Sequence, residues 1–297
     1  MRARLDRMLR CGTTYCEAKT GYGLDLANET KQLRALLAGA KGHPVGVAPT
    51  ALPAHEVPPE RRGSAALKQR YVDECRAEIL PALAELGARF VDVFCEEGVF
   101  SLEESAAILE AGKALGLVPR VHADELTPLG GASLAARMGA ASADHLLYAT
   151  DAGIRDMADS GVVATLLPGT SVFLRMNRYA AARKMIAAGV PVALGTDCNP
   201  GSSYTESLPA VAFLASLGMG LTVEETLTAM TLNAAASVRE AGRRGTLEPG
   251  KRADVVLLDA PALEHLVYHW GINLVSGVLV GGEPVAFRGE LLGSGAS

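Results

Sequence analysis

Residues 113–125 read KALGLVPRVHADE: the end of a helix, a glycine, a short β-branched run and a polar ending. The same order recurs in AELGARFVDVFCE (84–96), ADSGVVATLLPG (158–169) and AAGVPVALGTDCN (187–199). In each case the glycine stands where a helix C-cap leads into a strand. Helices and strands therefore alternate, and the short runs are apolar throughout, as is typical of parallel strands buried on both faces.

This alternation predicts an α/β barrel. The expected strands are 13–19, 45–52, 90–95, 118–122, 141–145, 162–167 and 192–196, which is one fewer than the eight of a closed (β/α)₈ barrel. A doubly wound open sheet is the alternative, but no G-x-G-x-x-G or G-x-x-x-x-G-K-[ST] loop follows any of these runs. We therefore expect a TIM-like (β/α)₈ barrel that lacks one βα unit.

Two further local patterns divide the chain. Ser101-x-x-Glu104 and Thr222-x-x-Glu225 are capping-box starts for helices between strands. After residue 244 the sequence pattern changes. In GTLEPGKRADVVLLDAP and LVSGVLVGGEPVAFRGE, Gly and Pro turns separate short strands. We expect a barrel over residues 1–244 and part of a small β-sandwich over residues 245–297.

Composition narrows the class of function. The 297 residues include 28 Lys and Arg against 33 Asp and Glu, and the net charge of −5 gives no reason to expect a nucleic-acid or membrane partner. We therefore expect a small-molecule substrate. No apolar stretch approaches the ~20 residues of a membrane span, and residues 1–14 lack the features of a secretory signal, so a cytoplasmic location is expected. The five cysteines form no C-x-x-C pair and favour reduced thiols.

Polar residues end several predicted strands, at the face where barrel enzymes carry their active sites. His122, His145 and Asp197 are of the types that bind Zn²⁺ or iron. A single histidine there is more often structural, but three at matched positions favour a metal site. Asp197 can bind a metal and also accept a proton from the water that the ion activates. Glu125 is a candidate general acid or base; alternatively, it complements a helix dipole.

Loops beside these strand ends carry further candidates. Asn199, Gly201 and Ser202 offer an amide, a backbone N–H and a hydroxyl to a polar substrate, although a plain turn has the same composition. Tyr22 and His55 also follow predicted strands, and either can equally be a plain surface residue.

Read in order, HADE (122–125), SADH (142–145) and TDCNPGS (196–202) resemble the imidazolonepropionase family of the amidohydrolase superfamily. KTGYGLD (19–25), FCEEGVFS (94–101) and TDCNPGSS (196–203) are together specific to this family, and LEPGKRADVV (247–256) is common in the superfamily. The resemblance runs from about Met8 to about Val280.

The resemblance implies a metal-dependent hydrolase that opens the cyclic amide of 4-imidazolone-5-propanoate to give N-formimidoyl-L-glutamate in histidine degradation. It also implies one Zn²⁺ or Fe²⁺/Fe³⁺ ion per site and a homodimer. The implied metal ligands are His122 and Asp197. The implied catalytic residues are Glu125, His145 and Asp197, and the implied substrate-binding residues are Tyr22, His55, Glu125, Asn199, Gly201 and Ser202.

The sequence departs from the family in one large respect. The family carries an H-x-H ligand pair on its first barrel strand, and this sequence contains no H-x-H. We interpret the chain as entering in the helix after that strand, so two further His ligands are expected from a missing N-terminal segment. A metal held by only two residues binds weakly, so we expect poor metal binding by the chain as printed. Two alternatives stay open: a catalytically inactive truncated relative, and another cyclic-amide hydrolase or deaminase of the superfamily.

Overall fold

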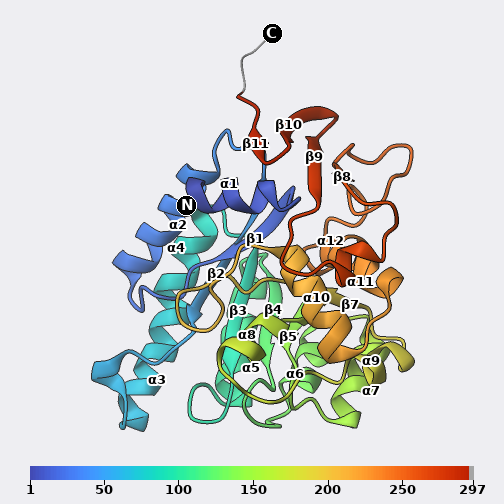
Figure 1. Ribbon diagram of the computed structural model, residues 1–297. Coiled ribbons are helices and arrows are strands. Elements are labelled where there is room, and N and C mark those ends of the chain that lie inside the picture. Colours follow the sequence, from blue (N-terminus) through green and yellow to red (C-terminus); the bar gives the residue numbers. More distant parts are fainter. Residues whose placement is uncertain (294–297) are drawn as a thin grey trace.

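The computed structural model describes residues 1–293 and is built around an open, barrel-type sheet of seven parallel strands (Figure 1). Each strand pairs with the next one along the chain, from β1 to β7. The strands are β1 (Tyr15–Lys19), β2 (Gly46–Ala54), β3 (Phe90–Cys95), β4 (Val118–Ala123), β5 (Ser142–His145), β6 (Val163–Leu166) and β7 (Val192–Leu194).

The seven expected strands are all present, and β1 and β7 are the two edges of the sheet. No described strand joins these edges, which confirms the prediction of a barrel-type sheet that lacks one unit.

Helices connect the strands and cover the outer face of the sheet (Figure 1). Several of them pack directly on strands: α2 on β2, α5 on β3 and α6 on β4. The helices are α1 (Arg2–Arg10), α2 (Leu26–Ala40), α3 (Ala65–Glu74), α4 (Leu80–Glu85), α5 (Leu102–Ala114), α6 (Gly131–Met138), α7 (Asp151–Ser160), α8 (Pro168–Phe173), α9 (Ala182–Ala187), α10 (Leu208–Met219), α11 (Val223–Met230), α12 (Leu232–Ser237) and α13 (His265–Tyr268), with a π-helical turn at Cys75–Ile79 and a 3₁₀ turn at Pro59–Arg61.

The local signals in the sequence act as predicted. Gly161 caps α7 in a left-handed conformation (φ +70°), which glycine adopts without a Cβ clash, and β6 begins two residues later. Both capping boxes form: the hydroxyls of Ser101 and Thr222 accept the N–H groups of Glu104 and Glu225, whose side chains accept in return.

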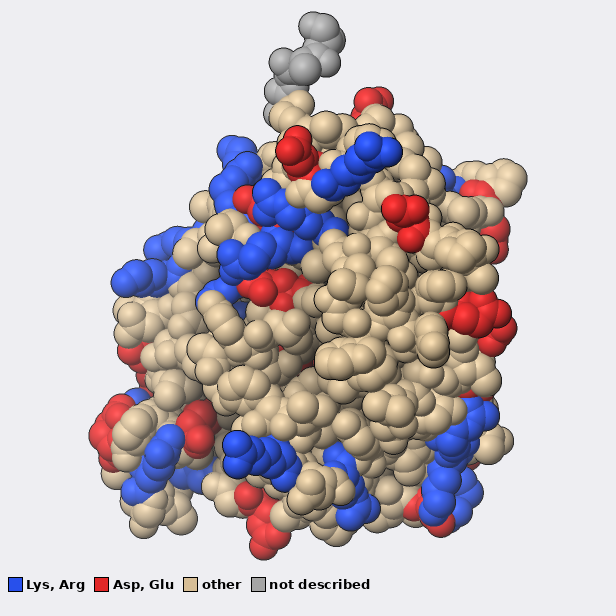
Figure 2. Space-filling model, viewed as in Figure 1, with Lys and Arg blue, Asp and Glu red and all other residues tan. Residues whose placement is uncertain are grey.

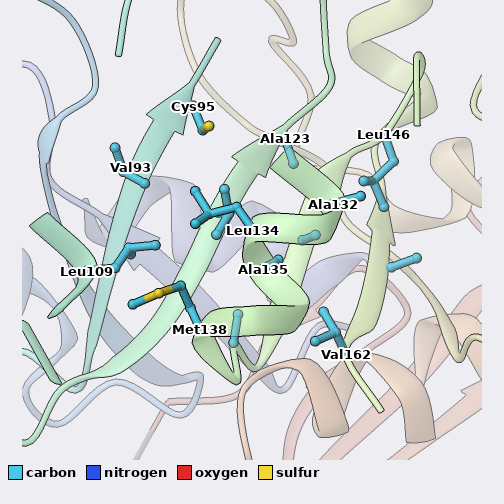
Figure 3. Packing of buried hydrophobic residues seen from close by; sticks show 14 of the residues in the cluster. Val93, Cys95, Leu109, Ala123, Ala132, Leu134, Ala135, Met138, Leu146 and Val162 are labelled. Atoms are coloured by element: carbon cyan, nitrogen blue, oxygen red, sulfur yellow. The ribbon is translucent and has the colours of Figure 1, made fainter. Parts of the chain in front are cut away.

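The main hydrophobic core lies between the sheet and its helices. Figure 3 shows Leu134 and Met138 of α6 facing Val93 of β3, with Leu109 of α5 beside them. This packing behind β4 holds in place the strand that carries His122.

Gly131 at the start of α6 allows this close approach. A Cβ added there would lie 2.8 Å from the Cβ of Ala123 and 2.9 Å from its Cα. We expect Gly131→Ala to lower the free energy of unfolding in urea by about 1–3 kcal/mol, because β4 and α6 must separate. The control is Gly242→Ala, where nothing lies within 4 Å of the added atom. Equal unfolding midpoints for the two variants would contradict the packing argument.

The inner face of the sheet corrects one expectation: the strands are not apolar throughout. Arg120 is only 1% exposed, and its Nε lies 2.9 Å from Glu17 while its Nη2 lies 3.2 Å from Asp144. It also donates to the carbonyl oxygen of Ser237 at 2.5 Å. Alternate residues of each strand point inward, and these charges are tolerated because they pair with one another.

A second, four-stranded antiparallel sheet follows the barrel, in the order β11-β10-β9-β8. Its strands are β8 (Val255–Leu258), β9 (Val275–Val280), β10 (Glu283–Phe287) and β11 (Glu290–Leu291). Leu5 and Leu9 of α1 pack on it, against Val278 and Ala286. The division at residues 244 and 245 stays a prediction, and residues 294–297 of the second predicted domain lie outside the described residues.

Basic side chains gather on the surface over α1 (Figure 2), which contributes Arg2, Arg4, Arg7 and Arg10. Arg7 is bound by Glu206 through two hydrogen bonds of 2.9 and 2.6 Å. This pair ties α1 to the loop after β7. Within residues 1–293, no helix is both long and apolar enough to cross a membrane.

Candidate active site

The backbone is unusual where three strands end. Asp124 after β4, His145 at the end of β5 and Asp197 after β7 have φ values of +49°, +74° and +48°. Left-handed φ is rare for residues other than glycine and persists where surrounding contacts enforce it, most often at functional sites. The strand ends predicted to carry chemistry are therefore among the places where the backbone is strained.

Five of the predicted site residues form one continuous group. The ring centroids of Tyr22 and His55 are 5.1 Å apart, those of His55 and His122 6.2 Å, and those of His122 and His145 5.3 Å. The Nε2 atom of His145 lies 3.5 Å from a carboxylate oxygen of Glu125. His145 is 3% and Glu125 8% exposed, whereas Tyr22 is 57% exposed, so Tyr22 lies at the outer end of the group.

Glu125 is positioned through its neighbours. Glu96, just beyond β3, accepts the backbone N–H of Leu126 at 2.8 Å and the hydroxyl of Thr127. On the other side, Asp124 accepts three N–H groups at the start of α6. Sequence reasoning missed Glu96, although FCEEGVFS contains it.

Asp197 is held by hydroxyl groups. The Thr170 hydroxyl donates to its Oδ2 at 2.7 Å, and the Ser202 hydroxyl lies 3.4 Å from the same atom. Asn199 donates to the carbonyl oxygen of Asp197 and accepts the N–H groups of Gly201 and Ser202 at 2.8 and 2.7 Å. The side chain of Asn199 therefore shapes the loop, and contact of these residues with a substrate stays a prediction.

The charges of this group act on one another. Burial and the neighbouring His122 lower the pKa of His55 to about 4, so His55 is neutral at pH 7. Burial and the charge of Asp197 raise the pKa of Tyr22. Burial lowers the pKa of His122, but the carboxylate of Asp92 more than offsets this and leaves the pKa above its ordinary value.

The loop that carries Tyr22 is fixed by Glu29, a buried residue of α2. One of its carboxylate oxygens accepts the N–H groups of Gly23 at 2.7 Å and Leu24 at 3.2 Å, and both oxygens accept that of Gly21. Nothing in the sequence distinguishes Glu29 from an ordinary first-turn glutamate.

We expect Glu29→Ala to lower the free energy of unfolding by about 1–3 kcal/mol, since three loop N–H groups lose their acceptor. Hydrogen exchange of the amides at residues 21–24 should become faster. Glu110→Ala, an exposed change on α5, is the control and should stay within about 0.5 kcal/mol. Unchanged exchange at residues 21–24 would show that the loop does not depend on Glu29.

One buried cluster offers metal-ligand atoms. Asp92, His122 and Asp144 each place one such atom within 4.8 Å of the others. The Nζ atom of Lys19 lies 2.5 Å from Asp92 and 3.1 Å from Asp144. Both carboxylates therefore already have a cationic partner. Sequence reasoning found His122 but not the other three residues.

Comparison with known proteins shows extended similarity in sequence. The profile of the amidohydrolase family matches residues 14–286. An imidazolonepropionase of Geobacillus kaustophilus (strain HTA426) is 50% identical over 289 residues, which are 97% of this chain and 67% of that protein. One of Shouchella clausii (strain KSM-K16) is 51% identical over 292 residues, 98% of this chain and 64% of that protein. The chain thus spans about two thirds of the length of these relatives.

Solved structures agree on the fold. An adenosine deaminase from Xanthomonas campestris with bound zinc has a TM-score of 0.72 at 21% identity, covering 97% of this chain and 69% of that one. A triazine hydrolase variant has a TM-score of 0.77 at 18% identity, covering 98% and 72%. At these identities the likeness supports the architecture and nothing finer.

Proposed function

Because the chain belongs to the amidohydrolase family and, within it, to the imidazolonepropionases, we propose that its site hydrolyses the cyclic amide of 4-imidazolone-5-propanoate. The reaction adds one water, breaks the bond between the ring carbonyl carbon and the adjacent nitrogen, and yields N-formimidoyl-L-glutamate. The observation that carries the proposal is the buried contact between Glu125 and His145 beside His122, on the segments HADE and SADH.

The resemblance to this family assigns His122 and Asp197 as the metal ligands that this chain would supply. Lys19 already pairs with Asp92 and Asp144, so an ion between those carboxylates would have to displace its ammonium group. The Nδ1 atom of His122 is at Asp92, which leaves its Nε2 for a metal. His122 and Asp197 would be two of the four ligands usual for Zn²⁺, and the same donors suit iron. When bound, such an ion polarises a carbonyl group and activates water.

In the proposed reaction, Glu125 transfers the proton and His145 stabilises the developing negative charge. Glu125 takes the proton of the attacking water and passes it to the ring nitrogen as the carbon–nitrogen bond breaks. His145, 3.5 Å from Glu125, donates a hydrogen bond to the carbonyl oxygen as negative charge develops there. Since both groups are almost fully buried, these interactions are screened little by water.

The outer residues would hold the rest of the substrate. His55 is neutral at pH 7 and offers a donor and an acceptor to the ring, and the exposed Tyr22 lies where a substrate side chain would leave the site. The loop from Asn199 to Ser202 adds backbone N–H and hydroxyl groups. A homodimeric state and a cytoplasmic location belong to the same proposal and rest on the resemblance to this family.

The test is hydrolysis by the purified chain supplied with Zn²⁺ or Fe²⁺, with the addition of water followed by mass spectrometry. Conversion of 4-imidazolone-5-propanoate, but not of adenosine or hydantoin, would support the proposal. Turnover of adenosine or hydantoin without turnover of the imidazolone would identify another cyclic-amide hydrolase or a deaminase.

A further inference from the structure

Asp92 on β3 makes a connection that the proposed mechanism does not use. Its Oδ2 atom lies 3.0 Å from Nδ1 of His122 and 2.5 Å from Nζ of Lys19. Its Oδ1 atom accepts the backbone N–H of Val93 at 2.8 Å, which fixes the rotation of the carboxylate. Asp92 is fully buried, so water does not compete for these contacts.

The surrounding charges distinguish Asp92 from the other carboxylates of the buried network. The buried network holds three carboxylates, Glu17, Asp92 and Asp144, against two permanent cations, Lys19 and Arg120. Asp144 is bound by Arg120, Lys19 and the hydroxyl of Ser142, so its charge is well satisfied. Among Lys and Arg side chains of the described residues, Asp92 pairs with Lys19 alone, and its Oδ2 also lies 3.0 Å from Nδ1 of His122.

We propose that Asp92 is the positioning residue of His122: it keeps the proton of the neutral ring on Nδ1, so that the lone pair of Nε2 points toward the site. A carboxylate on the far nitrogen is the usual way to fix the tautomer and the orientation of a histidine ligand. Lys19 of β1 acts one step further out, because it pairs with the Asp92 carboxylate of β3 and holds it in place. What Nε2 binds rests on the proposed function, but the tautomer itself does not.

Two isosteric variants separate this role from the general stability of the network. Asp92→Asn and Asp144→Asn each remove one buried carboxylate that contacts Lys19, but only Asp92 also has an oxygen 3.0 Å from Nδ1 of His122. The first measurement is the ¹⁵N spectrum of the histidine rings at alkaline pH, where the rings are neutral. The His122 signals are identified by their loss in His122→Gln.

We expect the Nδ1–H tautomer in the unmodified chain and in Asp144→Asn, and a mixture of tautomers in Asp92→Asn. The second measurement is Zn²⁺ affinity by competition with a chelating dye, and it should fall about 10–100-fold in Asp92→Asn and less in Asp144→Asn.

An Nε2–H tautomer in the unmodified chain would overturn the proposal, and this result needs no variant to fold. The same tautomer and the same Zn²⁺ affinity in both Asn variants would also overturn it. If the tautomer and the affinity change as expected but no imidazolone is hydrolysed, the role of Asp92 stands and the proposed function fails.

Discussion

Replacement of Glu125 by glutamine is expected to lower kcat for hydrolysis of 4-imidazolone-5-propanoate by about 10²–10⁴-fold, with little change in KM. Glutamine keeps the size and one acceptor of glutamate but cannot take a proton from water. Because Glu125 is only 8% exposed and lies beside His145, no solvent-exposed base can replace it. Steady-state rates at several pH values measure the loss.

The control for this variant is Glu97→Gln. Glu97 follows the buried Glu96 in the loop after β3 but is itself exposed. Its replacement should leave kcat unchanged. A value of kcat in Glu125→Gln close to that of the control would remove Glu125 from the proton transfer and leave it a role in substrate binding.

Replacement of Arg120 by methionine is expected to lower the free energy of unfolding by about 3–5 kcal/mol. The change keeps an unbranched side chain in the barrel but leaves Glu17 and Asp144 without the cation that lies about 3 Å from each. The carbonyl oxygen of Ser237 also loses a donor. Urea unfolding followed by circular dichroism measures the effect without any need for activity.

Arg76→Met is the matched comparison. The guanidinium of Arg76 lies 3.6 Å from Asp73, and both side chains are largely in solvent, so we expect a loss of only about 0–1 kcal/mol. Similar small losses in the two variants would mean that Lys19 alone can balance the carboxylates inside the barrel.

The sequence predicted the strands well because their signals are local. Gly87, Gly116, Gly161 and Gly189 each have positive φ, and a strand begins two or three residues after each of them. A glycine, a capping serine or a β-branched run acts within a few residues, and its meaning does not depend on the rest of the fold.

The site could be predicted only where it coincides with strand ends. His122 and His145 were found because both end strands, and Glu125 because it follows one. Lys19 and Asp92 are 73 residues apart, and they become neighbours only in the folded sheet, where β1 and β3 lie on either side of β2. Their pairing depends on tertiary contact: in the sequence Asp92 is a single charge inside the apolar run FVDVFC, and Lys19 follows the short stretch YCEA.

The packing of α1 on the last sheet has a consequence for synthesis on the ribosome. Each barrel strand pairs with the one before it, so the sheet can grow in the order in which it is made. Leu5 and Leu9, however, are covered by Val278 and Ala286, which are translated about 270 residues later. These two leucines therefore stay open to chaperones until Val278 and Ala286 have left the ribosome, and this cluster can form only after all seven barrel strands have been made.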